Sequence, residues 1–267
     1  MKIGFIGCGN MGEAFLRGVM GSGLLSAADI YVFDQLKDAA VAKTYGVNVC
    51  GSGPEVAEKA DAVFLAVKPN IYPYVIEEAK EALASKLIVT MAPGVTLGTM
   101  AERMLPHKGV RVIRTMPNLP LMIGEGCIAY TFGAEVTAAE KAFFTELFGK
   151  IGVSIEIKEE LYDAVTGASG SSPAFVFVFI EALADAAVAA GLARADAYRL
   201  VSQTVAGSAK MLLATGKHPG EWKDAVCSPG GTTIEGIMKL EENGFRGAIT
   251  KAAIATIEKT KKMGEKK

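Results

Sequence analysis

The feature that most constrains this chain is a glycine-rich turn that follows its first apolar run. Residues 3–6 have the composition of a buried strand, and the turn after them has the spacing G-x-G-x-x-G and opens a segment of helical pattern. In this spacing the first glycine permits a tight turn, the second lets the backbone approach a pyrophosphate, and the third lets the helix pack closely on the strand. The residues of the turn that we expect to contact such a ligand are Gly7, Gly9, Asn10, Met11 and Gly12. The turn predicts a dinucleotide-binding domain; the alternative is a glycine-rich turn without a ligand.

Residues 1–158 continue the pattern that this turn begins. Short apolar runs alternate with segments of helical length, and most of the runs are continuously apolar, as in parallel strands that helices cover on both faces. We expect strands at 2–7, 30–34, 62–67, 87–91, 110–115, 127–132 and 154–157, and helices at 11–20, 71–84, 97–105 and 137–150. The alternation predicts an α/β fold with a doubly wound, Rossmann-type sheet.

Residues 159–267 have a different texture, because strand-like runs give way to long Ala-rich segments of helical spacing. We expect helices at 172–190, 196–215, 219–226, 233–243 and 246–262. Ser172 and Pro173 have the residue types of a helix N-cap and first turn. Residues 174–190 are apolar on nearly every face, which in a small domain predicts cover by a second subunit. We therefore expect an all-helical C-terminal dimerisation domain and a homodimer formed through its helices.

A carboxylate ends the second predicted strand. Asp34 follows Gly12 at the distance where an acidic residue accepts hydrogen bonds from the 2′- and 3′-hydroxyls of an adenosine ribose. A 2′-phosphate would meet a like charge there, although Lys37 offers partial compensation. Asp34 therefore favours NADH over NADPH; the alternative is that it only caps the next helix.

Three later predicted strands end in proline-bearing loops. In open α/β sheets, ligands bind at the carboxyl ends of the strands, so these loops are expected to form one rim of the cleft. The loop residues that we expect to line its nicotinamide side are Val67, Lys68, Pro69, Ala92 and Asn118. Lys68 could reach a phosphate or the ring, but an exposed lysine after a strand is the ordinary situation.

Two further segments, residues 167–173 and 228–233, are rich in small hydroxyl residues and precede predicted helices. Each offers free backbone N–H groups at a positive helix end together with hydroxyl donors, which suits a bound carboxylate. The residues that we expect to bind substrate are Ser228, Gly230, Gly231, Thr232 and Thr233. The alternative in both places is a capped helix start.

Composition excludes several classes of function. The 28 Lys and Arg residues against 29 Asp and Glu leave a charge of -1, without the basic excess that nucleic-acid binding needs. The start of the chain lacks the pattern of a signal peptide, and Glu181 and Asp185 interrupt the most apolar stretch, so we expect a cytoplasmic protein without a membrane span. The four cysteines form no C-x-x-C pair, so we expect no metal site and no disulfides.

The residues that are missing narrow the chemistry. His107 and His218 are the two histidines, neither stands beside a motif that would make it a base, and no hydrolase or metalloprotease motif is present. Reduction of a carbonyl usually needs a general acid, whereas an imine nitrogen is basic enough to take a proton from solvent before a hydride arrives. A site built from hydroxyls and amides therefore suits reduction of an imine in a small-molecule substrate.

The chain resembles the pyrroline-5-carboxylate reductase family over essentially its whole length. The most specific segments are 171–175, 181–185, 191–192, 203–205, 209–212 and 228–234, together with the glycine turn and residues 67–69 and 116–118. The resemblance implies an NAD(P)H-dependent reductase that transfers a hydride to the C=N carbon of 1-pyrroline-5-carboxylate and gives L-proline in the last step of proline biosynthesis. It also implies a substrate carboxylate on the amides of residues 230–233, a catalytic Thr233 whose hydroxyl bonds the ring nitrogen, and dimers that often assemble into larger rings.

Two departures from the family leave cofactor choice open. Leu119 stands where the family often has threonine, and many members prefer NADPH, with hydroxyl and basic residues near the position of Asp34.

Two other classes of protein are alternatives to the reductase. The 3-hydroxyacid dehydrogenases have a similar segment at 167–172 but place a catalytic lysine where residues 175–177 are apolar here, and a dinucleotide-sensing protein would leave the 228–233 loop without a role.

Overall fold

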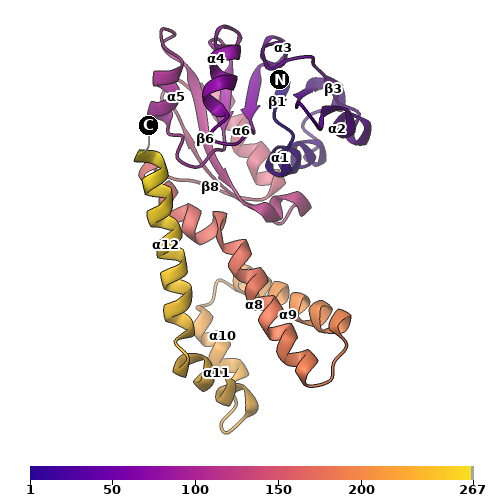
Figure 1. The fold of residues 1–267 in the computed structure, drawn as a ribbon, viewed down its shortest axis with the longest axis vertical. Coiled ribbons are helices and arrows are strands. Elements are labelled where there is room, and N and C mark those ends of the chain that lie inside the picture. Colours follow the sequence, from indigo (N-terminus) through magenta and orange to yellow (C-terminus); the bar gives the residue numbers. More distant parts are fainter. Residues whose placement is uncertain (266–267) are drawn as a thin grey trace. The chain divides into compact units, whose positions relative to one another are not determined.

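The computed structural model describes residues 1–265 and contains two compact units. The first comprises Met1–Ser171 with the C-terminal stretch Thr256–Lys267, and the second comprises Ser172–Ala255. We call them the sheet unit and the helical unit and describe each by itself (Figure 1).

Within the described residues, the sheet unit contains an eight-stranded sheet of order β3-β2-β1-β4-β5-β6-β7-β8. Its strands are β1 (Ile3–Ile6), β2 (Ile30–Phe33), β3 (Asn48–Val49), β4 (Ala62–Leu65), β5 (Leu87–Thr90), β6 (Arg111–Pro117), β7 (Cys127–Phe132) and β8 (Val153–Glu156). All pairs are parallel except β6 and β7. The chain passes from β6 to β7 through the short 3-10 helix Leu119–Ile123, and so short a link allows only an antiparallel return. The predicted α/β doubly wound fold is confirmed, and the two last predicted strands extend the sheet, with β7 antiparallel to β6.

Helices cover both faces of the sheet (Figure 1). One apolar cluster joins the sheet to α1 (Asn10–Gly21), α2 (Asp38–Tyr45) and α6 (Ala138–Ile151). The other joins it to α3 (Gly53–Lys59), α4 (Tyr72–Leu83) and α5 (Leu97–Arg103). Successive strand residues alternate between the clusters, so Phe5 belongs to the first and Ile6 to the second. Burial on both faces explains why the strands are continuously apolar.

The two compact units divide the chain after Ser171, and the predicted domain boundary after residue 158 stays a prediction. Residues 159–171 form a 3-10 turn (Glu159–Leu161), α7 (Tyr162–Val165) and a π-helical turn (Thr166–Gly170), and all lie in the sheet unit. The hydroxyl of Tyr162 donates to the Arg114 carbonyl oxygen at 2.6 Å, and the Arg114 guanidinium lies 4.0 Å from the Tyr162 ring centroid. Glu159 also pairs with Arg114, with an N–O distance of 2.9 Å. These contacts with β6 hold residues 159–171 on the sheet.

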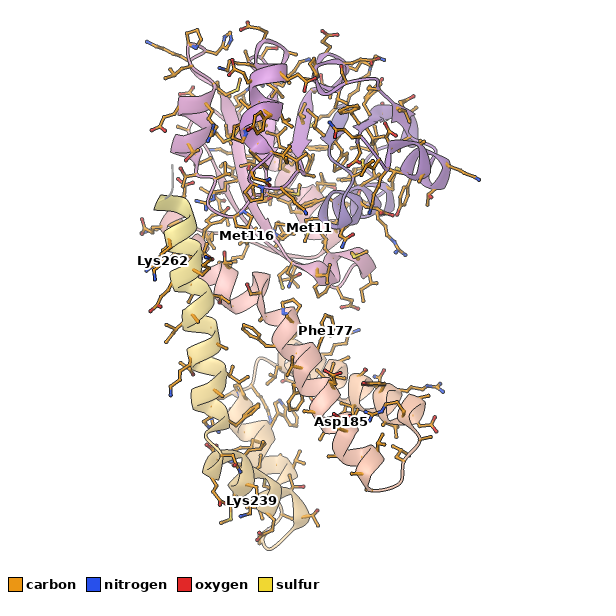
Figure 2. All side chains as sticks on the ribbon, in the orientation of Figure 1. Met11, Met116, Phe177, Asp185, Lys239 and Lys262 are labelled. Carbon is orange, nitrogen blue, oxygen red and sulfur yellow. The ribbon has the colours of Figure 1, made fainter. Side chains whose placement is uncertain are left out.

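The helical unit contains α8 (Ser172–Ala189), α9 (Arg194–Thr215), α10 (Pro219–Val226), α11 (Thr232–Glu242) and most of α12 (Phe245–Glu265). Its buried core is small and consists of Ala184, Ala197 and Val201. On α8, Phe177 is 56% exposed and Val178 is 64% exposed, and the Phe177 side chain projects away from the helix (Figure 2). The apolar residues of α8 therefore do not find their full cover within one chain.

By length and composition alone, one helical run in the described chain could cross a membrane. It is Glu159–Ala189, with a mean hydropathy of 1.7 over a window that is 6% buried. The run contains acidic residues, among them Glu181 and Asp185. Its exposure requires cover from outside the chain, and the expected absence of a membrane stays a prediction.

Candidate functional site

A cavity of about 540 Å³ opens at the carboxyl ends of β1, β4, β5 and β6 in the sheet unit. The order of the strands reverses here. From β1 the sheet extends through β2 and β3 to one side and through β4, β5 and β6 to the other. Its lining residues are Gly9, Asn10, Met11, Ala66, Val67, Lys68, Pro69, Met91, Ala92, Pro93, Met116, Pro117, Thr166, Gly170 and Ser171. Met11 and Met116 mark its place in Figure 2. Ligands of open α/β sheets bind at such a switch point.

The glycine turn at this cavity has a backbone that side chains would obstruct. Gly7 has a φ of 98°, and a Cβ there would lie 2.7 Å from the Ala66 carbonyl oxygen. A Cβ on Gly12 would lie 2.3 Å from the Gly7 carbonyl oxygen. Gly9 has no atom within 4 Å of such a position, so its backbone faces open space, and it caps α1 without a side-chain hydrogen bond. The first amides of α1 are therefore available to an anion, and the turn fits a pyrophosphate.

Asp34 is fixed beside this turn by backbone amides. One carboxylate oxygen accepts from the Cys8 N–H at 2.7 Å. The other accepts from the Leu36 N–H at 2.9 Å and from the Lys37 N–H at 3.1 Å. The next helix, α2, begins at Asp38 and has no side-chain cap, so capping of that helix does not explain Asp34. The carboxylate is oriented at the end of β2, where an adenosine ribose would lie.

The Cys8 thiol within the turn is unreactive at neutral pH. It is 1% exposed, and burial raises its pKa to about 12, with the Asp34 carboxylate adding to the rise. A thiol with such a pKa stays protonated at neutral pH and is a poor nucleophile. The role of Cys8 is to fill space and to present its backbone N–H to Asp34.

The rim of the cavity contains most of the predicted loop residues. Val67, Lys68, Pro69 and Ala92 line it, but Asn118 does not. The Asn118 side chain is 8% exposed overall, accepts from the Cys127 N–H at 2.9 Å and donates to the Ser169 hydroxyl at 3.2 Å. In this structure the Asn118 side chain links residues 127 and 169 through its two hydrogen bonds, and its contact with a cofactor stays a prediction.

The hydroxyl-rich segment at 167–173 is not a loop, which corrects our expectation of free backbone N–H groups there. The helical run continues from α7 through the π-helical turn into α8, and the Ser171 N–H donates to the Thr166 carbonyl oxygen at 2.8 Å. Packing of Tyr162 on β6 keeps the chain helical despite its Gly and Ser residues. The wide turn instead places Thr166, Gly170 and Ser171 in the cavity lining, a use often made of π-turns at functional sites.

The second hydroxyl-rich segment is a tight turn in the helical unit. The Gly231 N–H donates to the Ser228 carbonyl oxygen at 3.0 Å, and Gly230 has a φ of 67° that favours glycine. Gly231 then caps α11 without a side-chain hydrogen bond, so the amides of Thr232 and Thr233 open the helix. A Cβ on Gly231 would lie 2.3 Å from the Ser228 hydroxyl oxygen. The turn brings together all the predicted substrate-binding residues and offers an anion an uncapped helix start.

Comparisons with known proteins agree along the chain. A family model for pyrroline-5-carboxylate reductase dimerisation matches residues 159–263, and one for coenzyme F420-dependent NADP oxidoreductases matches residues 2–94. Pyrroline-5-carboxylate reductase of Escherichia coli (strain K12) is 47% identical over 267 residues, covering 99% of this chain and 98% of that protein. The Arabidopsis thaliana enzyme of the same name is 41% identical, covering 99% and 96%.

A crystal structure of Plasmodium falciparum pyrroline carboxylate reductase with NADP bound has a TM-score of 0.91. It is 33% identical in sequence, with 99% of this chain and 98% of that chain covered. The doubly wound sheet, the glycine turn and these matches define an oxidoreductase that uses a nicotinamide cofactor. More narrowly, the chain belongs to the pyrroline-5-carboxylate reductase family.

Proposed function

We propose that this protein reduces 1-pyrroline-5-carboxylate to L-proline with NADH or NADPH. The observation that carries the proposal is the similarity over the full chain, joined to a switch-point cavity whose glycine turn fits a pyrophosphate. The reaction would be the last step of proline biosynthesis, in the cytoplasm, with a small molecule and neither nucleic acid nor a membrane as partner.

The chain's own residues divide the work of holding the cofactor. The amides of Gly9, Asn10 and Met11 would bind the pyrophosphate, and Asp34 would accept hydrogen bonds from the adenosine ribose. The rim residues Val67, Lys68, Pro69 and Ala92 would face the nicotinamide half, with Asn118 behind them. A reduced nicotinamide bound there supplies a hydride to the carbon of the C=N bond.

We further propose that NADH is preferred. The Asp34 carboxylate is held in place by three backbone N–H groups and cannot turn away from a 2′-phosphate. Its negative charge would repel that group, and Lys37 is the nearby cation that would offset the repulsion. The NADP bound in the Plasmodium falciparum structure reports the cofactor of that protein and does not set the preference proposed for this chain.

The substrate carboxylate would rest on the 228–233 turn, where Ser228, Gly230, Gly231 and Thr232 would present amides and hydroxyls. The Thr233 hydroxyl would hydrogen-bond the ring nitrogen and orient it. That nitrogen takes one proton from solvent, and the carbon then takes the hydride, so the double bond becomes the amine of proline without a general acid from the chain.

The same proposal includes a homodimer formed through the C-terminal helices, with dimers that can assemble into a ring. The dimerisation family model begins at residue 159, and α8 exposes Phe177 and Val178. A soluble chain rarely leaves such apolar residues uncovered over a whole helix, so a second copy of α8 is the expected cover.

Purified protein is expected to oxidise NADH when 1-pyrroline-5-carboxylate is added, with proline as the product. Initial rates with NADH and with NADPH, followed by nicotinamide absorbance, test both the reaction and the cofactor preference. Tight NADH binding without consumption on any cyclic imine would reject the reductase and favour a dinucleotide-sensing protein. Turnover of 3-hydroxyacids instead would move the protein to the dehydrogenase class.

A further inference from the structure

Three buried hydroxyls belong to Tyr72 at the start of α4, Thr90 at the end of β5 and Thr115 within β6. Tyr72 is 1% exposed, Thr90 is fully buried and Thr115 is 1% exposed. The Tyr72 hydroxyl donates to the Leu65 carbonyl oxygen at 2.5 Å and lies 3.0 Å from the Thr90 hydroxyl oxygen. The Thr115 hydroxyl donates to the Thr90 carbonyl oxygen at 2.9 Å. A chain of hydrogen bonds therefore runs across β6, β5 and β4.

The direction of these bonds follows from the number of hydrogens. A tyrosine hydroxyl has one hydrogen, and in Tyr72 it is given to Leu65. The Tyr72 oxygen therefore accepts from the Thr90 hydroxyl and also from the Met91 N–H at 3.3 Å. Burial raises the Tyr72 pKa to about 12, so the hydroxyl keeps its hydrogen at neutral pH. A buried hydroxyl is costly unless it is bonded, and this one makes three bonds.

The bonds join the bases of two segments that line the cavity. Leu65 ends β4 and precedes residues 66–69, and Thr90 ends β5 and precedes residues 91–93. Tyr72 is the first residue of α4 and follows shortly after residues 66–69. Its bond to Leu65 therefore joins the chain just after this segment to the residue just before it. Its bonds to Thr90 and Met91 tie the same point to the second segment.

We propose that Tyr72 and Thr90 are positioning residues that set the spacing of the two rim segments at the nicotinamide half of the cavity. The inference rests on the proposed function, in which these segments face the nicotinamide. Hydride transfer depends steeply on the distance and orientation of the reacting atoms, so a small shift of the rim lowers kcat. The glycine turn and Asp34 bind the other half of the cofactor and lie outside the chain of hydroxyls, so the KM for NADH depends on it less.

The test removes one hydroxyl at a time and uses a matched tyrosine as control. Tyr72→Phe keeps the ring and loses the bonds, whereas Tyr130→Phe removes the hydroxyl of a buried tyrosine on β7 that does not line the cavity. We expect Tyr72→Phe to lower kcat roughly tenfold, as a sub-ångström misplacement would, while the KM for NADH stays within about twofold. Tyr130→Phe should stay within about twofold in both. Equal effects of the two changes on kcat, at matched melting temperature, would overturn the proposal.

Two threonine variants keep the proposal open to refutation if Tyr72→Phe fails to fold. Thr90→Val removes the hydroxyl and should lower kcat in the same direction, and Thr90→Ser should restore it. The double variant of Tyr72→Phe and Thr90→Val should fall no further than the larger single effect, because the bond between Tyr72 and Thr90 that Thr90→Val removes is already lost in Tyr72→Phe. Full additivity, or no rescue by serine, would contradict a shared role.

A binding measurement separates this inference from the proposed function. The fluorescence of bound NADH reports how its nicotinamide is held, and we expect it to change in Tyr72→Phe and not in Tyr130→Phe. Wild-type protein without turnover on the imine would reject the reductase, while this readout would still decide the positioning role. Active wild-type protein with unchanged kcat and fluorescence in Tyr72→Phe would reject the positioning role alone.

Discussion

The two units bury apolar surface in different ways. In the sheet unit each strand from β1 to β5, apart from the short edge strand β3, packs against helices on both faces, with a cluster rich in Phe and Leu on one side and one rich in Val, Ala and Ile on the other. In the helical unit the buried core is Ala184, Ala197 and Val201, and larger residues such as Phe177 stay exposed. The comparison indicates that the sheet unit fills its core within one chain, whereas the helical unit leaves large apolar residues uncovered.

The largest expected effect compares one candidate residue from each unit. Thr233→Ala should lower kcat/KM for the imine by about 100-fold, the usual cost of losing a donor aimed at the reacting group. Lys68→Ala should cost less than about tenfold, because Lys68 is exposed at the rim of the cavity and the proposed reaction needs no proton from it. Steady-state rates with both variants measure the difference. Equal or reversed effects would remove Thr233 from the mechanism.

A charged residue introduced on α8 should dissociate the proposed dimer and leave the fold of the sheet unit unchanged. Phe177→Asp is expected to convert dimers to monomers, because an unpaired carboxylate buried in an interface costs several kcal/mol, about 3 to 5 for a broken buried pair. Tyr74→Asp on α4, where Tyr74 is 73% exposed, is the matched control and should leave the assembly unchanged. Sedimentation at several concentrations measures both. A Phe177→Asp protein that stays dimeric would place the interface elsewhere.

The sequence allowed the fold of the sheet unit to be predicted because its signals are local. Continuous apolar runs and the glycine spacing identify β1, β4 and β5 without knowledge of distant contacts. The sequence analysis gives no range for the short strand β3 or for helices α2 and α3, since a two-residue strand and helices of eight and seven residues carry little periodicity. The antiparallel β7 depends on the length of one connection rather than on the strand's own residues.

The parts of the site that sequence reasoning missed depend on distant partners. The helix through residues 166–171 persists because Tyr162 bonds to a carbonyl 48 positions earlier, which outweighs local Gly and Ser signals. The Tyr72 hydroxyl meets Leu65 and Thr90 at separations of 7 and 18 residues, with no motif in the sequence between them. The 228–233 turn can be predicted from the sequence because its glycines and threonines are adjacent in the chain.

The glycine turn offers a matched pair within one helix of the sheet unit. Gly12→Ala places a methyl group 2.3 Å from the Gly7 carbonyl oxygen and should destabilise the fold by about 1 to 3 kcal/mol while weakening NADH binding. Gly21→Ala, at the end of the same α1, meets no atom within 4 Å and should be neutral or stabilising by up to about 1 kcal/mol. Denaturant unfolding and NADH titration measure both. A stable, fully binding Gly12→Ala protein would contradict the close approach.

The smallest expected effect sharpens the role of Asp34 as a feature of the sheet unit alone. Asp34→Asn removes the charge and keeps the size, so repulsion of a 2′-phosphate falls while the bonds from Cys8, Leu36 and Lys37 can persist. The ratio of kcat/KM for NADPH to that for NADH should rise about tenfold, which corresponds to about 1.4 kcal/mol. Asp38→Asn, four residues on at the start of α2, removes the same charge from a carboxylate that bonds the Ala39 N–H and should leave the ratio within about twofold. A ratio that responds equally to both changes would mean that cofactor preference follows the net charge of this end of the sheet and not the oriented carboxylate at the end of β2.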